Sequence, residues 1–212
     1  MKFRTSVLSG VLALACAPAA FAADTVDLSV TGTIVPTACT PTFSGGGVVD
    51  LGQINASALK ATGETQFNVY NASTLDIDCS GQVKFAIRTV DNRAGTEAGA
   101  QAADRFGLGV ASGGEKIGHF SLAAHGIKLD GVSNGVHLLS NDGGATWVDT
   151  WSDSSFQDSS LRAFTVSAYA PESVQHASMS VMADVWIADR STLPLSTQID
   201  IDGNVTFEVV YL

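Results

Sequence analysis

The chain has 212 residues, and its 21 acidic residues against 11 basic ones give a net charge of −10. An acidic chain without a basic cluster is poorly suited to bind nucleic acid or an anionic membrane surface. Its length suits one domain of roughly 150–200 residues, which is enough to bury a hydrophobic core.

The first 22 residues have the pattern of a secretory signal peptide. Lys2 and Arg4 are basic, residues 7–15 are apolar, and Ala-Phe-Ala at 20–22 is a small-x-small cleavage site. The apolar run is too short to span a bilayer, and no later run is long enough, so we expect export without membrane insertion. Cleavage removes two of the 11 basic residues and none of the 21 acidic ones, leaving a charge of −12.

Residues 24–34, at the start of the predicted mature chain, alternate strictly between two kinds of side chain. One parity carries Val26, Leu28, Val30, Gly32 and Ile34, and the other carries only Thr, Asp and Ser. This period of two is typical of a strand with one buried face. Chain termini usually fray, so this strand needs a sheet, either in its own chain or in a neighbour.

Two cysteines, Cys39 and Cys79, remain after the predicted cleavage. In an exported protein an even pair is expected to form a disulfide, with two free buried thiols as the alternative. No histidine lies near either cysteine in sequence, so a metal site there would lack ligands. We expect neither a metal ion nor a cofactor.

The rest of the chain is rich in Gly, Ser, Thr and Val and shows short alternating runs. We expect one helical turn within residues 55–63 and a surface loop at 91–101. Residues 75–89 and 105–124 have the pattern of hairpins that turn at Gly81-Gln82 and at residues 112–114. Further strand candidates are residues 48–54, 66–70, 126–130, 161–170 and 179–188.

The C-terminal residues predict another hairpin. Residues 199–201 and 205–212 flank Asp202-Gly203-Asn204, and an Asp-Gly step between alternating runs is a strong hairpin signal. The residues that share one face of the last strand are Val205, Phe207, Val209 and Tyr211. Several short strands separated by turns indicate an all-β sandwich.

Candidate catalytic residues are weakly supported. The four histidines, at positions 119, 125, 137 and 176, are expected in loops or in contact with solvent, and no Gly-x-Ser-x-Gly motif accompanies them. We therefore expect no enzyme activity. A secreted hydrolase is an alternative function to this expectation. A second alternative function is sugar binding, on a shelf formed by Trp147 and Trp151 near Asp142, Asp149 and Asp153. The competing interpretation is that the two tryptophans anchor loops that cap the sandwich.

Four features, in order along the chain, resemble a chaperone–usher pilin. They are the signal peptide, the alternating residues 26–34 with Gly32, the cysteine pair, and the alternating C-terminal strand with its penultimate Tyr211. Residues 31–39, 49–52 and 91–95 further resemble a proteobacterial family long labelled as of unknown function and linked to beta-class fimbriae.

The resemblance implies an incomplete immunoglobulin-like sandwich at residues 35–212, preceded by a donor-strand extension at 23–34. A periplasmic chaperone would pair with the C-terminal strand, and at an outer-membrane usher the N-terminal segment of the next subunit would replace it. Val26, Leu28, Val30, Gly32 and Ile34 would be the donor-strand residues in the acceptor groove of the neighbour. The residues that would line this groove or contact the chaperone are Val205, Phe207, Val209 and Tyr211. The expected function is a structural fimbrial subunit at the cell surface, with a tip adhesin or carbohydrate-binding module as the alternative.

Overall fold

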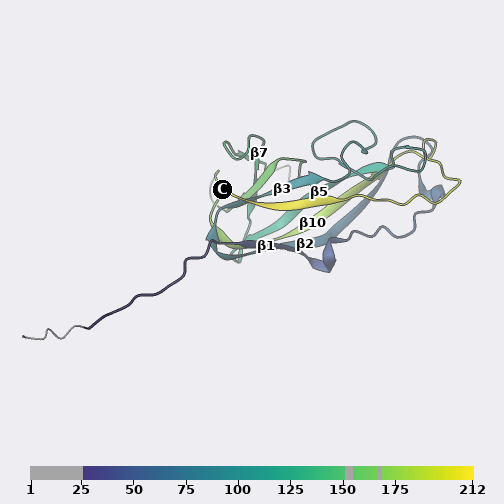
Figure 1. The fold of residues 1–212 in the computed structure, drawn as a ribbon. Coiled ribbons are helices and arrows are strands. Elements are labelled where there is room, and N and C mark those ends of the chain that lie inside the picture. The colour runs from purple at the N-terminus through teal and green to yellow at the C-terminus, as the bar shows by residue number, and fades with distance from the viewer. Residues whose placement is uncertain (1–25, 151–154, 167–168) are drawn as a thin grey trace, which may run out of the picture. The chain divides into compact units, whose positions relative to one another are not determined.

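The computed structural model describes residues 26–150, 155–166 and 169–212. The chain divides into two compact units, Met1–Val35 and Pro36–Leu212. In the first unit, the described residues 26–35 form neither strand nor helix. The second unit consists of two antiparallel sheets (Figure 1), which confirms the expected all-β sandwich. Within the described residues, no helix has the length and apolar character needed to cross a membrane.

The larger sheet, sheet A, has six strands in the order β1-β2-β10-β5-β4, with β6 also paired to β5. Their bounds are β1 Cys39–Phe43, β2 Thr65–Val83, β4 Phe106–Gly107, β5 Gly118–Leu129, β6 Val132–Ser133 and β10 Val174–Ile187. The predicted strand at 179–188 is confirmed as part of β10, and its apolar face is buried. The predicted hairpin at 105–124 is confirmed as β4 and β5.

Sheet B has five strands in the order β11-β3-β9-β7-β8. Their bounds are β3 Phe85–Asp91, β7 Val136–Ser140, β8 Val148–Asp149, β9 Leu161–Thr165 and β11 Val205–Tyr211. Two short 3-10 turns, η1 Ser44–Gly47 and η2 Ala56–Ala58, complete the described elements. The second lies in the stretch where one helical turn is expected.

The main core lies between the two sheets. Leu75 and Ile77 of β2 face Ile87 of β3 and Phe164 of β9, and all four are almost fully buried. These side chains occupy alternate positions of their strands, so each strand contributes one apolar face to the interior. A second cluster, with Leu108, Ile117, Val185, Leu193 and Leu59, extends this core.

Three of the expected elements are wrong. Residues 75–89 form no hairpin, because β2 belongs to sheet A and β3 to sheet B, and Gly81-Gln82 stays within β2. Residues 48–54 form no strand, although Val49 and Leu51 pack against the core clusters. Residues 199–201 form no hairpin arm, and the expected turn residues Asp202 and Asn204 bond instead to loops that precede β4 and β5.

Candidate functional site

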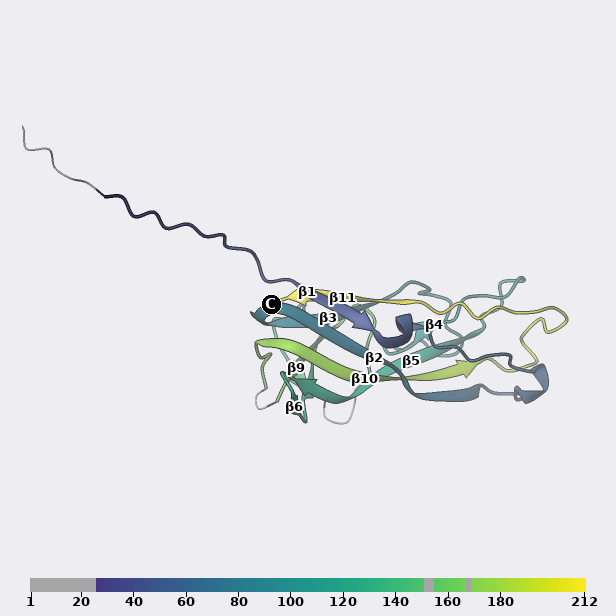
Figure 2. The same ribbon diagram turned by 90° about the horizontal axis from the view of Figure 1, so that it is seen from below.

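The strands β1 and β11 are the edges of sheets A and B on the same side of the sandwich (Figure 2). In the part of the chain that the structure describes, β11 pairs only with β3, and β1 pairs only with β2. The outer backbone groups of an edge strand have no ladder partner, so they can pair with a strand from another chain. The free edge of β11 is seven residues long.

A hollow of about 200 Å³, lined mostly by apolar side chains, lies beside this edge. Its lining includes Val205 and Phe207 of β11 together with Phe43, Val49 and Leu51. The inner face of sheet A contributes Phe120, Leu122, Val181, Ala183 and Val185, and Leu108, Ile201, Gly203 and Asn204 extend the lining beyond the start of β11. The hollow therefore offers both an apolar surface and an adjacent backbone edge.

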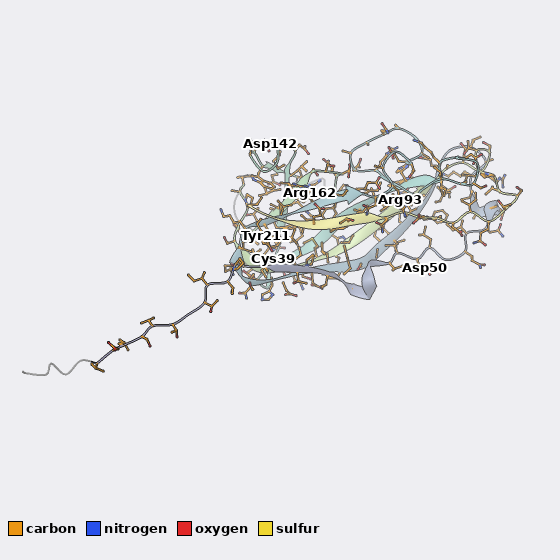
Figure 3. All side chains as sticks on the ribbon, viewed as in Figure 1. Cys39, Asp50, Arg93, Asp142, Arg162 and Tyr211 are labelled. Carbon is orange, nitrogen blue, oxygen red and sulfur yellow. A yellow bond between two sulfur atoms is a disulfide. The ribbon has the colours of Figure 1, made fainter. Side chains whose placement is uncertain are left out.

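The hollow is closed at the end where β11 finishes. The backbone N–H of Cys39 donates a hydrogen bond of 2.8 Å to the hydroxyl of Tyr211. Further along the same two strands, the rings of Phe43 and Phe207 meet edge-to-face with centroids 5.0 Å apart. Figure 3 shows Cys39 and Tyr211 close together, with Arg93 well away from them along the sandwich. Away from this contact, the lining of the hollow continues to Ile201 and Gly203.

The expected disulfide is confirmed, since Cys39 and Cys79 are joined by a bond of 2.05 Å between directly opposed positions of β1 and β2. Cys79 is buried in β2, so the bond fixes the start of β1 to sheet A. Because β1 also contacts β11 through Tyr211, the disulfide anchors one boundary of the hollow.

The expected acceptor residues occupy different environments. Val205 and Phe207 line the hollow, whereas Val209 packs against the main core. Tyr211 is 49% exposed and lies at the closed end, so the structure does not place its side chain in the hollow. Sequence alternation found these residues but missed the lining from other segments, such as Phe120, because alternation does not reveal which strands face each other.

The expected donor residues are exposed. Val26, Leu28 and Val30 are 96%, 92% and 91% exposed, and Ile34 is fully exposed. No heavy atom lies within 4 Å of the position that a Cβ would take on Gly32. Their insertion into a groove stays a prediction.

The histidines differ from expectation, because two of the four are buried in strands. His119 in β5 is 2% exposed, stacks on Trp186 with ring centroids 4.9 Å apart, and has its Nδ1 3.3 Å from Oε1 of Glu64. These two atoms are at ion-pair distance without the alignment of a hydrogen bond. Burial lowers the pKa of His119, and the Glu64 carboxylate opposes that shift.

His137 in β7 is the second buried histidine, and its Nε2 lies 3.0 Å from the carbonyl oxygen of Ala124. Among the described residues, no group of three His, Cys, Asp or Glu side chains is placed to hold a metal ion. Both buried histidines are thus surrounded by packed core residues and lie outside the hollow.

Trp147 packs against the outer face of sheet B, beside Leu138, Leu161 and Val210. This is the environment expected of a tryptophan that anchors a loop. Its predicted companions Trp151 and Asp153 lie outside the described residues, so the sugar-binding alternative stays a prediction.

The described residues form an all-β sandwich with a hollow, lined mostly by apolar side chains, beside the edge strand β11. A family model described as "Protein of unknown function (DUF1120)" matches residues 28–104. Two proteins of Escherichia coli (strain K12) are similar over nearly their whole length. "Protein GltF" is 28% identical, with 100% of both chains covered, and "Uncharacterized protein YhcF" is 26% identical, with 92% of this chain and 94% of that protein covered. The family match includes the three segments that carry the resemblance to a family of unknown function.

Proposed function

We propose that this protein is a structural subunit of a fimbrium that polymerises by donor-strand exchange. The observation that carries the proposal is the apolar hollow beside the free edge of β11, in a chain whose residues 26–34 present alternating apolar side chains to solvent. The hollow supplies apolar burial, and the edge supplies backbone donors and acceptors. These are the two requirements for adding a strand from a second chain.

The energetics favour such an exchange. Burying Val26, Leu28, Val30 and Ile34 contributes about 1.5–3 kcal/mol for each side chain, or about 6–12 kcal/mol in total. Association and ordering of the segment oppose part of this gain. New ladder hydrogen bonds along β11 add to it, because the outer groups of this edge have no strand partner in the described chain.

The geometry of the hollow favours one direction of insertion. In this proposal the segment enters from the Gly203 end, because β1 and β11 are joined at the other end by the bond between Cys39 and Tyr211. Val26 then goes deepest, and Ile34 stays near the entrance, so the inserted strand runs antiparallel to β11. Full insertion requires β1 to move away from β11. The neighbour's own sandwich lies outside the entrance, and repeated head-to-tail contacts of this kind build an open filament.

The proposal includes partners that act before assembly. An unpaired edge beside an apolar groove is prone to aggregate, so a periplasmic chaperone pairs with β11 until an outer-membrane usher passes the subunit to its neighbour. The disulfide between Cys39 and Cys79 is consistent with passage through an oxidising compartment. In this proposal the protein ends in the fimbrium at the cell surface and has a structural, non-enzymatic role.

Deleting residues 24–33 tests the proposal. We expect subunits that fold and bind the chaperone but form no fibres by electron microscopy. Val30→Asp and Thr31→Asp form a matched pair, since they place the same charge on opposite faces of the segment. Val30→Asp should block fibre growth, and Thr31→Asp should preserve it. Fibres of normal length and number from the deletion variant would refute the proposal.

A further inference from the structure

The loop at residues 91–96 is tightly fixed to the segment around β4. Asp91 accepts hydrogen bonds of 2.8 Å from the backbone N–H groups of Arg93 and Gly107. The hydroxyl of Thr96 donates to the carbonyl of Arg93 at 2.7 Å and accepts from the N–H of Gly109 at 3.0 Å. Two of these bonds engage the N–H and the carbonyl of Arg93, so they hold its backbone in place.

Two residues of this loop bind the chain that leads into β11. Nε and Nη2 of Arg93 donate to Oδ2 of Asp202, at 2.9 and 2.7 Å. The backbone N–H of Asn92 donates to the carbonyl of Asn204 at 3.0 Å, and its side-chain amide donates to the side chains of Asn204 and Thr206. The ladder between β3 and β11 begins at Val205, so most of these bonds lie beyond its end.

The chain held in this way is a wall of the hollow, because Ile201, Gly203 and Asn204 all line it. This wall packs closely against other lining residues of the hollow, since a Cβ on Gly203 would approach Phe120 to 2.7 Å and Leu108 to 2.9 Å. The wall around Gly203 is therefore held on both sides, by Phe120 and Leu108 within the hollow and by the 91–96 loop outside.

We propose that Asn92 and Arg93 are positioning residues that hold this wall ready for the donor segment of a second copy of the chain. This inference rests on the proposed function, since the occupant is the alternating segment at residues 26–34. A wall that is already in place loses less conformational freedom when a strand docks, and this speeds productive capture. The ion pair has exposed side chains, 37% for Arg93 and 64% for Asp202, so its contribution to overall stability is small.

The test measures capture of a fluorescent peptide with the sequence of residues 24–36 by the purified, oxidised full-length protein, followed by anisotropy. Arg93→Glu places a carboxylate beside that of Asp202, so the two side chains repel each other. We expect the association rate to fall roughly fivefold. The double variant Arg93→Glu with Asp202→Arg restores the pair with reversed polarity, and its rate should return to within about twofold of the wild type. Asp202→Asn, a milder change, should slow capture roughly twofold.

Arg88→Glu is the matched control. Arg88 pairs with Glu208 at 3.6 Å, also between β3 and β11, and the two side chains are 40% and 47% exposed. Glu208 lies on the opposite face of β11 from Phe207, so this charge change leaves the wall intact. We expect capture at the wild-type rate, and thermal unfolding of every variant is measured in the same buffer.

The outcomes separate the two proposals. A wild-type protein that captures no peptide contradicts the proposed function itself. Capture by the wild type with an equal rate for Arg93→Glu and Asp202→Asn overturns the positioning role and leaves the proposed function standing. Equal slowing by Arg88→Glu, or no rescue by Asp202→Arg, also overturns it, because the effect then does not come from the Arg93–Asp202 pair.

Discussion

The backbone N–H of Cys39 and the hydroxyl of Tyr211 are joined by a hydrogen bond of 2.8 Å that links the edges of the two sheets. Cys39 is held to β2 by its disulfide, and Tyr211 ends the ladder with β3 at Phe85. The junction of β1 and β11 therefore combines this hydrogen bond with the edge-to-face contact of Phe43 and Phe207. This makes Tyr211 part of the closure of the hollow and not of its lining.

Tyr211→Phe should lower the free energy of unfolding by about 1 kcal/mol, because it removes that hydrogen bond and retains the ring. Urea denaturation of the oxidised protein measures the change. Tyr70→Phe is the control, since Tyr70 is a 68% exposed tyrosine in β2. Equal stability of Tyr211→Phe and wild type would show that the bond between the two edges contributes nothing.

Gly203→Ala should destabilise the protein by roughly 1–3 kcal/mol, the range for overpacking. The added methyl group would meet Phe120 at 2.7 Å and Leu108 at 2.9 Å, so either these side chains or the wall of the hollow must shift. Gly81→Ala is a matched control, because the nearest atom to its added Cβ is the hydroxyl of Thr37 at 3.9 Å. Thermal unfolding compares the two, and similar melting temperatures would contradict the close packing described for Gly203.

Local patterns in the sequence predicted the strands and their buried faces well. The alternation of Met179, Val181 and Ala183 predicts one buried face, and the structure buries all three in β10. The position of Cys79 on the apolar face of its strand, together with an exported chain, predicts the disulfide with Cys39. In both cases a period of two decides the outcome, and this period depends only on neighbours along the chain.

The assignment of strands to sheets could not be predicted in this way. Cys79 and Phe85 both face the interior, yet they do so from opposite sheets, and alternation is the same for a hairpin and for a crossing between sheets. The Asp202-Gly203 step has the sequence of a turn, but its side chain and backbone are engaged by Arg93 and Leu108. The hollow combines segments from residue 43 to residue 207, so its existence depends on tertiary contacts that no local pattern contains.

His119 should make stability depend on pH. Burial lowers its pKa in the folded protein below the ordinary 6.5, and although Glu64 and Asp104 oppose this shift, Arg105 adds to it. The unfolded chain therefore binds a proton more readily, and the stabilising contribution is lost as the pH falls below about 6.5 toward the folded pKa. The slope of stability against pH that His119 adds there is at most about 1.4 kcal/mol per pH unit.

Chemical denaturation between about pH 5 and pH 7.5, where histidine titrates, measures this slope for the wild type and for His119→Gln. The variant should lose less stability on acidification, because glutamine takes up no proton. His125→Gln serves as the control, since His125 lies in the same strand with its Nε2 bonded to Oδ1 of Asn71 in an exposed position. Identical slopes for wild type and His119→Gln would show that burial of this imidazole carries no proton linkage.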